Sequence, residues 1–141
     1  MAQAIFNEMA IRVGLAESFK ADSAGIYVSK NSTETALNAQ KIMKEKFDID
    51  ISNYKPKIIS KKLIEDADLI LCMEEGMSDF LKSIKDQNLE IDTLGNYCGM
   101  PQDVLDPYGG NEDIYYECAK NIEELIEKLM DKLLKSKEEN E

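Results

Sequence analysis

The spacing of apolar residues along the chain predicts helices that alternate with short strands. The chain opens inside a helical repeat that ends near Gly14, with no capping side chain or strand ahead of it. The continuous apolar run from Asp68 to Met73 predicts a buried strand, as in parallel sheets. The remaining pattern predicts strands at 20–26 and 91–94, and helices at 33–47, at 60–65, from residue 76 onward and at 112–135.

This alternation predicts an α/β fold built on a parallel sheet. It fits one domain, residues 1–135, followed by a charged tail at 136–141 that is expected to fray. In parallel sheets ligands bind at the carboxyl ends of strands, so residues that follow strands are candidates for a site. Helical spacing places these apolar side chains toward the core: Met77, Phe80, Leu81 and Ile84, and in the last helix Ile114, Cys118, Ile122, Leu125, Leu129 and Leu133.

Composition and charge narrow the classes of function. The 141 residues carry a formal net charge of −11, which argues against nucleic acid as a partner, because phosphate backbones need a basic surface. No histidine occurs, which excludes Ser-His-Asp, Cys-His and histidine–metal chemistry for the chain by itself. No apolar run approaches the ~20 residues of a membrane span, and the N-terminus is not a signal peptide. Three cysteines without a CxxC pair favour a reduced, cytoplasmic protein.

The most specific motif is the loop 106–110, Asp-Pro-Tyr-Gly-Gly, which precedes the last predicted helix. The proline fixes its own φ and pushes Asp106 into an extended conformation, while the two glycines allow a sharp turn. Such a loop can aim one carboxylate and one aromatic ring at a ligand. On spacing alone it also fits an ordinary strand-to-helix turn with Asn111 as the helix cap.

This loop, placed before a long C-terminal helix, resembles the acid loop of the low-molecular-weight protein-tyrosine phosphatases. Residues 22–25, Asp-Ser-Ala-Gly, resemble the second strand of that family, and residues 67–73, Ala-Asp-Leu-Ile-Leu-Cys-Met, resemble its third. The opening Met-Ala-Gln-Ala-Ile-Phe resembles the helix that follows the family's phosphate-binding loop. These matches occur in the family's order over essentially the whole chain. The run from Asp103 to Pro107, with the glycine pair, most resembles the bacterial subgroup that includes protein-arginine phosphatases.

The resemblance implies a flavodoxin-like, four-stranded parallel sheet flanked by helices. It also implies dephosphorylation of protein phosphotyrosine or phosphoarginine through a phosphocysteine intermediate, with no cofactor and no metal. Asp106 corresponds to the general acid, and Tyr108 and Tyr27 correspond to the walls of the substrate cleft. Ser23 corresponds to a residue that supports the catalytic loop by hydrogen bonding. The partner is then a phosphorylated protein, while its identity and the oligomeric state are left open.

One motif of the family is absent from the sequence. The catalytic Cys-x5-Arg-Ser loop has no counterpart, because the residues six positions beyond Cys72, Cys98 and Cys118 are Ser78, Val104 and Glu124. That loop supplies the nucleophile and the phosphate-binding arginine, and it follows the family's central first strand. We therefore expect the chain to begin after the loop and to be inactive as given. We also expect it to be unstable or aggregation-prone, since two inner strand edges lack their partner.

Other interpretations stay open. The chain also fits a non-catalytic relic or binding module that kept the fold and the cleft but lost catalysis. An arsenate reductase of the same architecture needs a close cysteine pair after the third strand, and Cys72 has no partner before Cys98. A receiver-type signalling domain lacks support, because no acidic cluster ends a first strand. Cys72 and Cys118 are expected to be packing residues, while a redox role stays open for Cys98.

Overall fold

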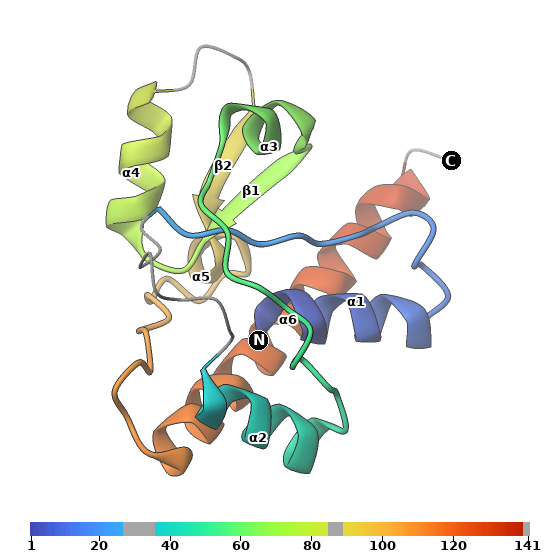
Figure 1. Cartoon of the computed structure of the whole chain (residues 1–141). Helices are drawn as coiled ribbons and strands as arrows, with labels where there is room; N and C mark the ends of the chain where they lie inside the picture. Colours follow the sequence, from blue (N-terminus) through green and yellow to red (C-terminus); the bar gives the residue numbers. More distant parts are fainter. Residues whose placement is uncertain (27–35, 85–88, 140–141) are drawn as a thin grey trace.

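The largest body of packed side chains lies between three helices, α1 (Ala2–Arg12), α2 (Leu37–Phe47) and α6 (Glu112–Glu139) (Figure 1). The computed structural model describes residues 1–26, 36–84 and 89–139. Within these residues α1 and α2 both pack on α6. The helix predicted at the start of the chain is confirmed, and no side chain caps its first turn.

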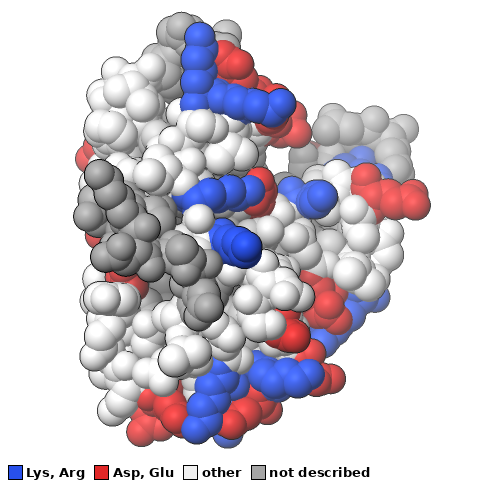
Figure 2. Space-filling view, in the orientation of Figure 1, with Lys and Arg blue, Asp and Glu red and all other residues white. Residues whose placement is uncertain are grey.

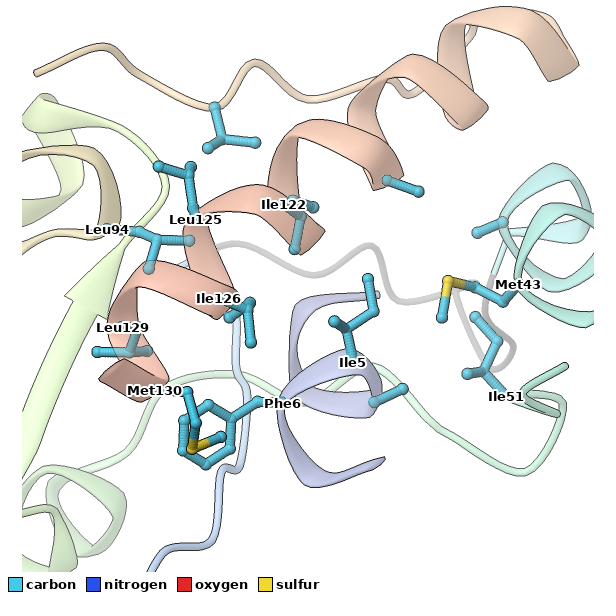
Figure 3. Close-up of a cluster of buried hydrophobic side chains, with 14 of the residues drawn as sticks. Ile5, Phe6, Met43, Ile51, Leu94, Ile122, Leu125, Ile126, Leu129 and Met130 are labelled. Carbon is cyan, nitrogen blue, oxygen red and sulfur yellow. The ribbon is translucent and has the colours of Figure 1, made fainter. Parts of the chain in front are cut away.

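The main core follows the helical repeat of α6. Figure 3 shows Ile5 and Phe6 of α1 and Met43 of α2 in one buried cluster with side chains of α6. The α6 side chains recur at spacings of three and four residues, so they form one continuous apolar stripe. Those at the centre of the cluster are Ile122, Leu125, Ile126, Leu129 and Met130.

The sheet in the described part of the chain has two parallel strands, β1 (Leu69–Cys72) and β2 (Glu90–Thr93). Cys72 pairs with Thr93, so the two strands end level with one another. This confirms the strand predicted from the apolar run, as well as the parallel α/β class. The run is only half-buried from Leu69 to Leu71, whereas a fully buried strand was expected. Within the described residues β1 has a neighbouring strand on one edge alone, which accounts for the difference.

Three shorter helices complete the sheet region: α3 (Lys61–Asp66), α4 (Glu75–Ile84) and α5 (Leu94–Tyr97). Ser60 caps α3 as predicted, since its Oγ accepts a hydrogen bond from the Leu63 N–H (3.2 Å). A second, smaller core of Cys72, Leu81 and Ile91 joins α4 to both strands.

The strand predicted at 20–26 is wrong. Only Gly25 of this segment forms a bridge, with Ile58: its N–H donates to the Lys57 carbonyl (2.9 Å) and its carbonyl accepts from the Ile59 N–H (2.8 Å). A strand needs a ladder of such bonds, and β1 is paired with β2 alone, so the segment has no continuous partner. The resemblance implied a four-stranded sheet whose central first strand was expected to be missing from this chain; within the described residues the sheet has two strands.

Three side chains predicted to face the core are exposed instead. Phe80 and Ile84 of α4 are 47% and 55% exposed, and Ile114 of α6 is 51% exposed. Only Leu81 of the α4 set is fully buried, because the narrow sheet covers one side of that helix. Phe80 and Ile84 line an open groove of about 450 Å³ together with Ile58.

The last helix is longer than the pattern predicted. It continues through residues 136–139, which had been assigned to the charged tail. Its first turn carries Glu112 and Asp113, which suits the positive end of the helix dipole. Among the helices of the described residues, none combines the length and the apolar character needed to cross a bilayer.

Truncation of Met43 tests the position of the main core. Met43→Ala is expected to lower the free energy of unfolding by about 2–5 kcal/mol, because the side chain is fully buried and its loss leaves a cavity. Leu37→Ala is the matched control on the same helix, where the side chain is 75% exposed, and it should change stability by less than about 0.5 kcal/mol. Urea unfolding of both variants gives the measurement, and equal losses would contradict this core.

Candidate active site

The 106–110 loop forms a tight turn that holds the Asp106 carboxylate against its own backbone. Asp106 Oδ1 accepts a hydrogen bond from the Tyr108 N–H (3.0 Å), and the Gly110 N–H donates to the Pro107 carbonyl (2.8 Å). Gly109 has a φ of +83°, at the position where a type II turn requires a positive φ. The loop is therefore a defined turn with one carboxylate oxygen already engaged.

The helix side of the loop is anchored by two asparagines. Asn111 caps α6, since its Oδ1 accepts a hydrogen bond from the Ile114 N–H (3.0 Å). Asn38 of α2 donates from its Nδ2 to the Gly110 carbonyl (3.1 Å). These bonds tie the end of the turn to α2 and α6, two of the three helices that form the main core.

The strand side of the loop is anchored at the end of β1. The Val104 N–H donates to the carbonyl of Met73, the residue that follows β1 (2.8 Å). Asp103 Oδ1 accepts a hydrogen bond from the N–H of Glu75, the first residue of α4 (3.1 Å). The residues that lead into the loop are therefore held beside the carboxyl end of β1. Parallel sheets bind ligands at this edge.

The amino end of α1 faces this loop. Cys118 of α6 donates from its Sγ to the carbonyl of Leu105, the residue before Asp106 (3.7 Å). Burial raises the pKa of the Cys118 thiol, while the Met1 amino group acts to lower it and the Asp106 carboxylate to raise it. Both charged groups act on the same thiol, so the start of α1 and Asp106 lie close to one stretch of α6. A helix N-terminus favours anions through its free N–H groups and its dipole.

Side chains of α1 also hold residues 21–23. Ser23 Oγ donates to Gln3 Oε1 (2.6 Å). Asn7 makes two hydrogen bonds to Ala21, from its Nδ2 to the carbonyl (3.0 Å) and from the backbone N–H to its Oδ1 (2.8 Å). Ser23 therefore supports the first turn of α1, and its role toward a catalytic loop stays a prediction.

The structure places the predicted site residues in more than one segment of the chain. Asp106 and Tyr108 share the 106–110 loop, where the Tyr108 side chain is 83% exposed and free to meet a ligand. Ser23 lies beside α1, and no hydrogen bond joins it to the loop within the described residues. Tyr27 lies outside the described residues. Tyr115, which the sequence pattern did not single out, lies four residues after the Asn111 cap and is buried.

None of the three cysteines has the character of an activated nucleophile. Burial is the main cause that raises the pKa of Cys72, of Cys98 and of Cys118, so each favours the neutral thiol. A nucleophilic cysteine needs the opposite shift.

The described residues also hold no group of three His, Cys, Asp or Glu side chains that could bind a metal ion. Figure 2 shows acidic and basic side chains interspersed over one face of the molecule.

The fold and the loop define a class of protein, a small α/β domain in which the Asp106 loop is anchored at the carboxyl end of a parallel strand. The sequence then identifies the family: a sequence model of the low molecular weight phosphotyrosine protein phosphatases matches residues 1–139. The chain belongs to this family, and the resemblance of its motifs is confirmed.

Individual relatives agree with this assignment. The chain is 31% identical over 139 residues to the protein-arginine-phosphatase of Bacillus subtilis (strain 168), covering 97% of this chain and 89% of that protein. A low molecular weight protein tyrosine phosphatase from T. tengcongensis has a similar structure, with a TM-score of 0.85, 29% identity and coverage of 93% and 88%. A YwlE arginine phosphatase, a cysteine-to-serine mutant with a phosphorylated active-site serine, gives a TM-score of 0.85, 32% identity and coverage of 95% and 86%. These similarities confirm the fold class.

Substitution of Gly110 tests the shape of the loop. Gly110→Ala is expected to cost roughly 1–3 kcal/mol of stability, because its Cβ would lie 2.9 Å from the Pro107 carbonyl oxygen and 2.8 Å from Ile114 Cγ2. Gly76→Ala has open space around the new Cβ within α4, so it should leave stability unchanged or raise it by up to about 1 kcal/mol. Thermal unfolding distinguishes the two, and a neutral Gly110 variant would refute the turn.

The Asp22–Lys57 pair gives a pH-dependent contribution to stability. A hydrogen bond from Lys57 Nζ to Asp22 Oδ2 (2.7 Å) is the main cause that lowers the pKa of Asp22. The ionised carboxylate is therefore favoured in the folded state, and the contribution is present at neutral pH and lost as pH falls through the lowered pKa. Both side chains are about half exposed, so it amounts to at most about 1 kcal/mol.

Unfolding of Asp22→Asn at several pH values tests this contribution. The stability difference from the parent chain should be present at pH 7, should begin to fall near the ordinary carboxyl pKa of about 4, and should be lost once the pH is below the lowered pKa of Asp22. Asp48→Asn, whose side chain is 92% exposed, is the control and should show a smaller difference. A difference for Asp22→Asn that grows as the pH falls would contradict the ion pair.

Proposed function

We propose that this chain is a protein phosphatase of the low-molecular-weight class, in which Asp106 is the general acid. The observation that carries the proposal is the anchored Asp106 loop at the carboxyl end of β1, beside the amino end of α1. In a chain of this family, that juxtaposition suits a phosphoryl group held at the helix terminus with a proton donor next to it.

The reaction proceeds in two displacements. A cysteine thiolate attacks phosphorus while the bond to the leaving oxygen or nitrogen breaks, and Asp106 gives that atom its proton. The resulting carboxylate then takes a proton from water as the water attacks the phosphocysteine, which releases phosphate and the thiolate. The three cysteines of the sequence are not the nucleophile in this proposal, because each is a protonated thiol without arginine six residues later.

Phosphotyrosine and phosphoarginine in proteins are the substrates to compare. Similarity to a protein-arginine-phosphatase over 97% of this chain supports phosphoarginine. The exposed ring of Tyr108 can stack on the aromatic ring of one substrate or on the planar guanidinium group of the other. Tyr27 is the proposed second wall of the cleft. Three free cysteines in the described residues support a reduced compartment such as the cytoplasm.

A fusion that supplies the absent motif tests the proposal. An apolar strand and a Cys-x5-Arg-Ser loop from a family member are joined ahead of Ala2, and phosphate release from a phosphotyrosine peptide and an arginine-phosphorylated protein is measured. The 141-residue chain alone is expected to release none, whereas the fusion should be active. Asp106→Asn in the fusion should lower kcat by about 10²- to 10⁴-fold, because asparagine has no acidic proton to give.

Asp103→Asn in the same fusion is the matched control. Its carboxylate caps α4, and asparagine accepts the same hydrogen bond, so kcat should stay unchanged. Equal effects of the two substitutions would sink the assignment of Asp106. A fusion that stays inactive, together with a soluble 141-residue chain that unfolds cooperatively and binds phosphorylated protein, would instead favour a non-catalytic binding module.

A further inference from the structure

The hydroxyl of Tyr115 takes no part in the contacts described above. The side chain is only 5% exposed and its ring belongs to the main core. Within the described part of the chain, this hydroxyl makes no hydrogen bond. Every fully buried side-chain oxygen in that part has a hydrogen-bond partner, so an oxygen without a partner is not fully buried. The Tyr115 hydroxyl oxygen therefore reaches solvent although its ring is buried, so it opens onto a surface.

That surface is the candidate active site. Tyr115 and Cys118 are three residues apart on α6, so they lie on one face of the helix. The Cys118 thiol contacts the Leu105 carbonyl (3.7 Å), which puts this face against the chain that leads into Asp106. Burial is the main cause that raises the pKa of Tyr115, followed by the negative charge of Asp106, then by Tyr108 and Cys118. All three neighbours are groups of the site.

We propose that Tyr115 is a positioning residue for Asp106, with its hydroxyl hydrogen-bonded to the carboxylate oxygen that the 106–110 loop leaves unused. The inference rests on the proposed function of Asp106. Oδ1 of Asp106 accepts the Tyr108 N–H (3.0 Å), which leaves Oδ2 for Tyr115.

A hydroxyl suits this task because Asp106 changes its protonation state during the reaction. The phenol can donate to the carboxylate, and it can accept from the protonated carboxyl group. The same contact therefore holds the side chain before and after the proton is transferred. The raised pKa of Tyr115 keeps the phenol protonated, and so able to donate, throughout the neutral range.

Titration of ¹³C-labelled tyrosine in the full 141-residue chain tests the contact. The Tyr115 signal is assigned by its loss in Tyr115→Phe, or by backbone-linked assignment if that variant does not fold. It should titrate above the ordinary value for tyrosine and move downward in Asp106→Asn, because a negative acceptor is removed. Asp113→Asn is the control, nearer in sequence and exposed, and it should leave the Tyr115 titration unchanged.

Hydrogen exchange of the Tyr108 N–H gives a second readout, since that amide reports the orientation of the Asp106 carboxylate. Tyr115→Phe should reduce its protection, while Tyr116→Phe, the adjacent tyrosine, should not. The proposal would be overturned if the pKa of Tyr115 did not change in Asp106→Asn. It would also be overturned if Tyr115→Phe lost stability without changing the exchange protection of the Tyr108 N–H. Neither readout needs turnover, so failure of the positioning role is distinguishable from failure of the proposed phosphatase activity.

Discussion

The packing of α1 along α6 is the contact on which the candidate site depends. An isolated helix of eleven residues is marginal in water, and α1 has no capping side chain, so tertiary burial has to hold it. Ile5 and Phe6 provide that burial, and the hydrogen bonds of Gln3 and Asn7 fix the rotation of the helix. Because α1 is held in this way, its amino end stays near the stretch of α6 around Cys118, which also lies near Asp106.

The 106–110 loop depends on the same three-helix core. Asn38 of α2 donates a hydrogen bond to the end of the turn. Beside it, Lys41 of α2 forms an ion pair with Glu112 of α6 (2.7 Å), which adds a contact between the two helices. On the other side, Val104 is buried and bonded to the end of β1. The carboxylate of Asp106 is thus carried by rigid elements at both ends, which suits a group that must be aimed.

The sheet region is less completely paired and covered than the helical core within the described residues. A two-stranded parallel sheet is unusual on its own, because parallel strands are normally covered on both faces and paired on both edges. Here β1 has a partner on one edge only, its first three residues are half-buried, and the segment at 20–26 forms one bridge. The exposed Phe80 and Ile84 of α4 belong to the same incompletely covered region.

Local sequence determined the helices other than α5, the β1 strand, the caps at Ser60 and Asn111, and the turn at 106–110, because each rests on spacing or on the chemistry of a few adjacent residues. It also determined the family, through motifs in a recognisable order. Only the tertiary structure decided that 20–26 is not a strand, that Phe80 and Ile114 are exposed, and that the ring of Tyr115 is buried in the main core. The physical reason is that ladder partners, helix cover and the surroundings of a hydroxyl come from residues far away in the chain, which local periodicity does not record.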